Sequence, residues 1–202
     1  MTLNRRELLL AGAAITLVGA GATVAGLPLL SSARADDAAP SAADLADAGP
    51  NGDVMLGSDK APVTIIEYAS MTCPHCAHFS ENTFPELKKR YIDTGKVRFT
   101  LRTFPLDQLA AAGFMIAICG GKDKYMPIVE TLFAKQFGIT EDQFNKCLAN
   151  QKVLDNIQAV RDHAVKLGVN STPTFFINGK KMVGDLSIDQ MAKEIDPYLK
   201  TG

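Results

Sequence analysis

The sequence is poor in cysteine and histidine and carries almost no net charge. Its 202 residues include four cysteines and three histidines, and the formal net charge is −1. No run of basic residues is present, so nothing indicates a nucleic-acid partner. The single Cys-x-x-Cys motif has no second copy, which argues against the paired motifs of a zinc-ribbon site. No internal repeat is visible either.

The first part of the chain is typical of an export signal. Arg5 and Arg6 precede an uncharged stretch over 8–30, and residues 31–35 end in an Ala-x-Ala cleavage site. The paired arginines resemble a twin-arginine (Tat) signal, with Sec export as the alternative. An uncleaved membrane anchor is a competing interpretation, but the glycines in the stretch make it a poor one. Residues 1–35 are therefore predicted to be a cleaved signal peptide and the mature chain to be periplasmic.

The composition changes again after the predicted signal. Residues 36–53 are rich in Ala, Asp, Pro and Gly. They offer little apolar surface to bury, so they are predicted to be a flexible lead-in. The remaining chain, 54–202, is long enough for one domain with a substantial core.

The motif Cys73-Pro74-His75-Cys76 follows a run of strand-forming residues, Val63–Ala69. This order places Cys73 at the end of a strand and Cys76 one turn into a helix, which is the redox form of the pattern. Unpaired N–H groups at the helix N-terminus favour a thiolate at Cys73. Pro74 suits the first turn, since its missing N–H has no acceptor there, and His75 can add a donor or a positive charge. A low-pKa thiolate beside a second thiol predicts thiol–disulfide exchange.

A soft-metal site is the alternative interpretation of this motif. Cys73, Cys76 and the nearby histidines could supply ligands for Cu(I) or zinc. Side chains on a single helical turn can hardly complete a tetrahedron by themselves. The redox dithiol is therefore the preferred interpretation, and neither a metal nor a cofactor is predicted.

The hydrophobic patterns along the chain predict an α/β fold. The expected strands cover residues 63–69, 96–102, 174–177 and 180–183. The expected helices cover residues 74–91, 108–119, 125–137, 141–149, 152–167 and 188–199. Pro85 should kink the first helix, and Asn178-Gly179 predicts a type I′ hairpin between the last two strands. The order predicts a thioredoxin-like sheet with an α-helical domain inserted at about 107–167.

The Cys-Pro-His-Cys motif, the inserted helices and the later Thr172-Pro173-Thr174 together resemble the DsbA family of exported thiol oxidases. The resemblance covers about residues 54–200. It implies that Cys73 is the nucleophile, that Cys76 resolves the mixed disulfide and that His75 sets the oxidising strength. It also implies reduced exported proteins as substrates and a membrane reoxidase of the DsbB type as a partner.

The resemblance implies roles for three further residues. Pro173 follows a cis bond in the family, and the backbone of Thr172 faces the cysteines. Thr172 replaces an apolar residue of the best-known oxidases and is similar to isomerase and reductase relatives, so those activities stay open as alternatives. Such relatives generally need a dimerisation module, for which 36–53 is too short and too polar, so a monomer is expected. Glu67 is either an acid that serves proton transfer to the resolving thiol or an edge-strand residue facing solvent.

Cys119 and Cys147 lie in the predicted helical insert. Four cysteines allow three pairings, and the pairing of Cys119 with Cys147 leaves the redox pair free. A structural disulfide between them is expected in an oxidising compartment. Two buried free thiols that act as small hydrophobic side chains are the alternative.

Overall fold

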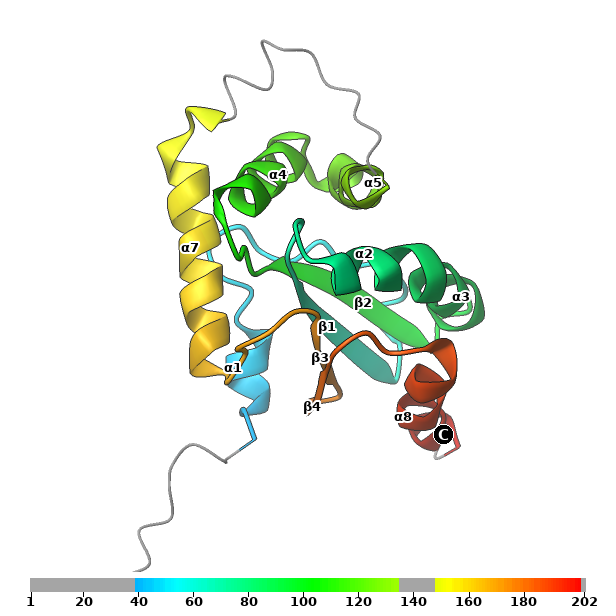
Figure 1. Ribbon diagram of the computed structural model, residues 1–202. Coiled ribbons are helices and arrows are strands. Elements are labelled where there is room, and N and C mark those ends of the chain that lie inside the picture. The colour runs from blue at the N-terminus through cyan, green and yellow to red at the C-terminus, as the bar shows by residue number, and fades with distance from the viewer. Residues whose placement is uncertain (1–38, 135–147, 201–202) are drawn as a thin grey trace, which may run out of the picture. The chain divides into compact units, whose positions relative to one another are not determined.

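A mixed sheet lies at the centre of the fold in the computed structural model, which describes residues 39–134 and 148–200 (Figure 1). The strands are β1 (Val63–Ala69), β2 (Val97–Thr103), β3 (Thr174–Ile177) and β4 (Lys180–Val183). They lie in the order β2-β1-β3-β4. β1 pairs parallel to β2 and antiparallel to β3, and β3 pairs antiparallel to β4. The prediction of a thioredoxin-like sheet with inserted helices is confirmed.

Helices cover both faces of this sheet (Figure 1). One face carries α1 (Ala42–Ala46) and α7 (Gln151–Lys166). The other face carries α8 (Ile188–Leu199) and a helical run made of α2 (Pro74–His78), η2 (Phe79–Thr83), α3 (Phe84–Leu87) and η3 (Lys88–Ile92).

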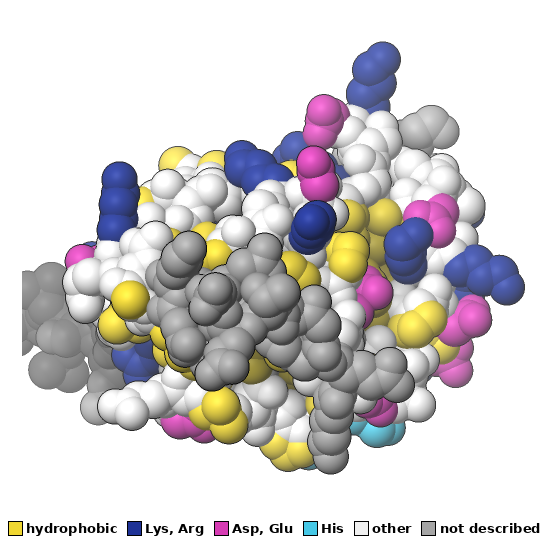
Figure 2. Space-filling view, turned by 90° about the horizontal axis from the view of Figure 1, so that it is seen from above, with side chains coloured by type: hydrophobic (Ala, Val, Ile, Leu, Met, Phe, Trp, Pro, Cys, Tyr) yellow, Lys and Arg dark blue, Asp and Glu magenta, His cyan; other side chains and the backbone are white. Residues whose placement is uncertain are grey.

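The inserted helices α4 (Gln108–Cys119) and α5 (Lys122–Phe133) lie at one end of the sheet. They pack against each other, and α4 also packs against α7. Figure 2 looks onto the side of the molecule where these helices lie, and there basic, acidic and hydrophobic side chains are interspersed.

The central strand β1 is buried on both faces. Alternate side chains of a strand point to opposite sides, so Ile65 and Ala69 face the core beneath α2, α3 and α8. Ile66 and Tyr68 face a second core beneath α1 and α7. Glu67 therefore shares the face of Ile65 and Ala69, directly under the helix that carries the cysteine motif.

The helix predicted over 74–91 is continuous but is not a uniform α-helix. The wider π turns η2 and η3 alternate with α2 and α3, and Pro85 lies in the first turn of α3. At the end of η2 the Phe84 N–H donates to the Phe79 carbonyl five residues back. A proline in a helix removes one donor and crowds the preceding turn. The π turn before Pro85 makes room for it, so a π bulge occurs where a simple kink was expected.

The predicted hairpin between β3 and β4 is confirmed. Asn178 and Gly179 both have positive φ, 44° and 86°. Two such residues in sequence are what a type I′ turn requires. The second strand begins one residue later than expected, at Val97.

The prediction of a flexible lead-in over 36–53 is wrong for its described part. Ala42–Ala46 form α1, whose N-terminus has a capping box between Ser41 and Asp44. Leu45 of this helix is buried in the second core. A short apolar anchor thus orders a segment whose overall composition is polar.

Some predictions fall on residues outside the described ranges. These are the signal peptide at 1–35, most of the helix expected at 141–149, and Cys147. Within the described ranges, no helix combines the length and the apolar character that crossing a bilayer requires.

A buried ion pair ties the lead-in to the sheet. Arg102 of β2 donates from Nε and Nη2 to the two carboxylate oxygens of Asp53, at 2.9 and 2.8 Å. Its Nη1 donates to the Tyr68 hydroxyl, and its Nη2 also donates to the Leu45 carbonyl. The two charged side chains are only 3% and 18% exposed. Four of the five N–H donors of the guanidinium are therefore used inside the fold.

We expect Asp53→Ala to destabilise the protein strongly, because it leaves the buried Arg102 cation without its counter-charge. Removal of one partner of a buried pair costs about 3–5 kcal/mol of unfolding free energy. Asp93→Ala is the matched control, since the Lys88–Asp93 pair is 45% and 53% exposed. That change should cost no more than about 1 kcal/mol. Urea unfolding of both variants measures the difference, and equal losses would contradict a structural role for the buried pair.

Candidate active site

The two thiols of the motif lie at the junction of β1 and α2. Cys73 is the N-cap of α2, and its N–H donates to the Ser70 carbonyl at 3.1 Å. Cys73 is 6% exposed and Cys76 is fully buried, and both are free thiols. Pro74 occupies the first turn of α2, as expected from its missing N–H. Cys73 is therefore slightly accessible to solvent, and Cys76 is not accessible at all.

A second segment, far away in sequence, completes the site. The Cys73 thiol donates to the Thr172 carbonyl oxygen at 3.3 Å. The Thr172–Pro173 bond is cis, as the family resemblance implied. The Thr172 hydroxyl is buried and has no hydrogen-bond partner among the described residues. Both the backbone and the side chain of Thr172 thus face the reactive sulfur.

The environment shifts the pKa of the two thiols in opposite directions. Partial burial opposes ionisation of Cys73, but the adjacent Thr172 hydroxyl, which is free to donate to a thiolate, and the backbone N–H groups of Cys76 and His75 lower its pKa overall. Burial raises the pKa of Cys76 far above that of a free thiol, and the negative charges of Glu67 and Cys73 raise it further. The thiolate is therefore stable at Cys73 and unstable at Cys76.

Glu67 lies inside the protein, on the central strand of the sheet. It is 2% exposed, and its neighbours in the sheet are Leu101 of β2 and Phe175 of β3. Burial raises its pKa to about 8, and the nearby charge of Cys73 adds to the shift. The alternative of a solvent-facing edge residue is excluded, and a titratable carboxyl group lies beneath the two thiols.

The two histidines of the motif region are at the surface. His75 is exposed at the second position of α2, where its backbone contributes to the low pKa of Cys73. His78, one turn later, forms an ion pair with Asp185. The preceding Gly184 N–H donates to the Pro173 carbonyl at 2.9 Å. The pair therefore bridges the active-site helix and the loop that follows β4.

The sequence analysis missed a polar link between the motif and the inserted helices. The Thr72 hydroxyl donates to Asp107 Oδ2 at 2.8 Å, and the Leu106 N–H donates to Ser70 Oγ at 3.2 Å. Asp107 also caps α4, since its Oδ1 accepts the Ala110 N–H at 2.7 Å. An aspartate before a predicted helix is a recognisable N-cap signal. Nothing in the sequence pairs it with Thr72.

The remaining cysteines are only partly within the described ranges. Cys119, at the exposed end of α4, is disulfide-bonded. The alternative of a buried free thiol is therefore wrong for Cys119, but its pairing with Cys147 stays a prediction. Within the described ranges, no group of three or more His, Cys, Asp and Glu side chains could hold a metal ion.

Comparison with known proteins places this geometry in a family. Residues 50–197 match the sequence family described as thioredoxin. The crystal structure of alpha-DsbA1 from Wolbachia pipientis is 30% identical, with a TM-score of 0.70, and the match covers 78% of this chain and 96% of that one. The oxidised structure of BdbD from Bacillus subtilis, at 22% identity and a TM-score of 0.66, shares the fold over 73% of this chain and 93% of that one.

Curated sequences point the same way. A protein of Rickettsia conorii that is provisionally named a protein-disulfide oxidoreductase is 31% identical over 73% of this chain, which spans about three fifths (61%) of that relative's length. A Bacillus cereus protein provisionally named disulfide bond formation protein D is 31% identical over 72% of this chain and 78% of its own length. The chain therefore belongs to the thioredoxin family and, within it, to the DsbA-like proteins.

Proposed function

We propose that the chain is a thiol:disulfide oxidoreductase that introduces disulfides into exported proteins through Cys73 and Cys76. The observation that carries this proposal is the placement of the two thiols: Cys73 lies at the N-terminus of α2 against the Thr172 carbonyl, and Cys76 is fully buried. This placement shifts the pKa values of the two thiols in opposite directions. A stabilised Cys73 thiolate favours the reduced form of the enzyme, so the Cys73–Cys76 disulfide readily accepts electrons from a substrate. The same asymmetry assigns Cys73 to the attack on substrate and the fully buried Cys76 to resolution.

In the first step, a substrate thiolate attacks Cys73 Sγ of the enzyme disulfide. A mixed disulfide forms, the Cys73–Cys76 bond breaks and Cys76 departs as a thiolate. Burial makes that thiolate unstable, so it must take up a proton. Glu67 retains a proton at neutral pH and interacts electrostatically with Cys76, so it is the group placed to deliver one.

In the second step, another substrate thiolate attacks the substrate sulfur of the mixed disulfide. Cys73 departs as its stabilised thiolate, and the substrate leaves with a new disulfide. Two substrate thiols are oxidised and the enzyme disulfide is reduced to a dithiol, so the electrons balance. A membrane reoxidase of the DsbB type, implied by the family resemblance, would then restore the enzyme disulfide.

The backbone of Thr172 is the proposed binding point for an extended substrate chain. Its carbonyl oxygen lies 3.3 Å from Cys73 Sγ and accepts a hydrogen bond from the protonated thiol. When Cys73 is a thiolate or part of a disulfide it has no proton to donate, so this carbonyl is free to accept a substrate N–H, as in strand addition.

The proposed location and assembly rest on the sequence. The Tat-like segment at 1–35, with its Ala-x-Ala site, supports export to the periplasm with cleavage of the signal. We also propose that the mature protein acts as a monomer.

We expect Cys76→Ser to accumulate a mixed disulfide with an unfolded substrate protein that contains a disulfide. The Cys73 thiolate attacks that disulfide, one substrate sulfur leaves as a thiolate, and no Cys76 thiol is present to resolve the new bond. Non-reducing electrophoresis detects the complex, and Cys73→Ser, as the matched control, should form none. In the wild type, a reduction potential of about −120 mV for the Cys73–Cys76 disulfide would support an oxidase. A potential of about −270 mV is typical of a reductase and would overturn that assignment.

We expect Thr172→Val to raise the pKa of Cys73 by up to about one unit, since it removes a hydroxyl donor to the thiolate. Ultraviolet titration of the thiolate in a Cys76→Ser background measures this pKa. Thr172→Ser keeps the hydroxyl and should leave the value close to that of the parent. An unchanged pKa in the valine variant would show that the hydroxyl does not reach the sulfur.

We expect Glu67→Gln to stabilise the reduced protein increasingly as the pH rises from about 4.5 to about 8, because the pKa of Glu67 is raised to about 8 in the fold. In that range the unfolded chain releases the proton that the folded state keeps, so wild-type stability falls with pH through this group. Urea unfolding of both proteins at several pH values gives the difference in free energy. A difference independent of pH would contradict the raised pKa.

A further inference from the structure

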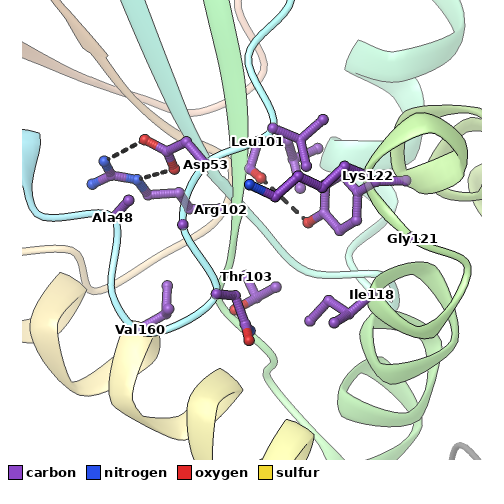
Figure 3. A pocket seen from close by; sticks show the side chains of 13 residues that line it. Ala48, Asp53, Leu101, Arg102, Thr103, Ile118, Gly121, Lys122 and Val160 are labelled. Atoms are coloured by element: carbon purple, nitrogen blue, oxygen red, sulfur yellow. Dashed lines mark hydrogen bonds and ion pairs between the residues drawn. The ribbon is translucent and has the colours of Figure 1, made fainter.

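The two ends of α4 meet the rest of the fold in different ways. Its C-terminal end borders a pocket that Ile118 lines together with Leu101 and Thr103 of β2 (Figure 3). The empty volume of this pocket is about 500 Å³ with the open mouth included. The N-terminal end of α4 is instead tied by hydrogen bonds to the turn at 70–72, which leads from β1 to Cys73.

A ring of hydrogen bonds joins this turn to the start of α4. The Leu106 N–H donates to Ser70 Oγ at 3.2 Å, and the Thr72 hydroxyl donates to Asp107 Oδ2 at 2.8 Å. Ser70 Oγ and Thr72 Oγ1 lie 3.4 Å apart. A hydroxyl group has one proton to donate, and that of Thr72 is used toward Asp107, so Ser70 is the donor to Thr72. The ring closes because Leu106 and Asp107 are neighbours in the chain.

Two further contacts hold the same turn. A Cβ added at Gly113 of α4 would lie 3.0 Å from Met71 Cγ, so the Met71 side chain packs directly on the backbone of α4. The Phe104 N–H donates to the Ala69 carbonyl at 2.8 Å, immediately before the turn. The position of the turn is therefore set by the start of α4 and the segment before it, as well as by β1.

Ser70 connects this ring to both thiols. It is fully buried, and its carbonyl accepts the Cys73 N–H at 3.1 Å. Burial raises the pKa of Cys76, and a hydrogen bond involving the Ser70 backbone partly opposes that rise. Cys73 is the N-cap of α2, where the backbone N–H groups of His75 and Cys76 help to offset burial and lower its pKa. A displacement of the turn would therefore move Cys73 Sγ away from these donors.

We propose that Ser70 is a positioning residue for the Cys73 thiolate, acting through the ring of hydrogen bonds that ties it to the start of α4. The ring holds the turn in place against the N-terminus of α2. Supporting hydrogen bonds of this kind keep a reactive side chain in its working geometry. The role rests on the proposed thiol–disulfide exchange, in which Cys73 departs from the substrate as a thiolate.

The test measures the pKa of Cys73 by ultraviolet titration of the thiolate in a Cys76→Ser background. Ser70→Ala opens the ring, and we expect it to raise this pKa by up to about one unit, because the donors are then less well aligned. Thr72→Val opens the ring at a second bond, at nearly constant volume and with no change of charge, and should act in the same direction. Thr72→Ser keeps the hydroxyl and should restore the parent value. If Ser70→Ala does not fold, the two Thr72 variants decide the question.

Thr131→Val is the matched control. The Thr131 hydroxyl donates to the Pro127 carbonyl at 2.6 Å within α5, so this change removes a hydrogen bond of the inserted helices outside the ring. It should leave the pKa of Cys73 unchanged. A parent-like pKa of Cys73 in Ser70→Ala and Thr72→Val would refute the proposal, even if both variants lost stability in urea, because a bond that supports only the fold changes stability alone. An equal rise in Thr131→Val would refute it as well.

The result is separate from the assignment as an oxidase. The reduction potential of the wild type decides between oxidase and reductase. The difference in the pKa of Cys73 between the parent and the variants decides the role of Ser70, whichever potential is found. Either proposal can therefore fail while the other stands.

Discussion

The antiparallel pairing of β1 with β3 is the constraint on which the candidate site depends. Tyr68, near the end of β1, is paired with Thr174 at the start of β3. The residues that follow β1 and those that precede β3 must therefore meet at the same end of the sheet. Cys73 belongs to the first group and Thr172 to the second, which is why their atoms make a hydrogen bond across 99 positions of sequence. The pairing register of β1 and β3 therefore brings the two halves of the reactive centre together.

Burial gives the two cysteine side chains, which are chemically identical, different pKa values. One helical turn separates the thiols, but Cys73 lies at the end of the helix and Cys76 lies over Glu67 and the apolar core. The first site supplies several donors to a thiolate, whereas burial is the largest influence on the second and outweighs a backbone hydrogen bond involving Ser70. A difference in position of three residues thus becomes a difference in acidity, and the direction of electron flow follows from it.

Features set by local sequence could be predicted, and features set by tertiary partners could not. β1, α4 and the Asn178-Gly179 hairpin agree with the predictions because periodicity and turn chemistry decide them. The helix α1 carried a readable signal, since Ser41 and Asp44 have the spacing of a capping box, but the polar composition around it hid the buried Leu45.

The sequence does not show which residues a buried charged side chain will contact in the fold. The alternation of polar and apolar residues predicts that Arg102 lies on a strand. It does not predict that Arg102 pairs with Asp53, 49 residues earlier. Glu67 is similar, since sequence alone left its burial undecided between two alternatives. Glu67 is buried because β1 has a neighbouring strand on each side, β2 and β3, which the sequence does not reveal.

The outer strand β4 affects how readily the protein aggregates with other chains. Its free edge exposes backbone groups that could pair with any extended chain, and a protein that handles unfolded chains meets many of them. Lys180 and Lys181 stand exposed on this strand, and Lys180 is held by Glu194 of α8. Charged side chains on an edge strand discourage the growth of a sheet across molecules. In the proposed function an extended chain binds beside Thr172, and the charged side chains of β4 would keep the same chain from pairing with that edge.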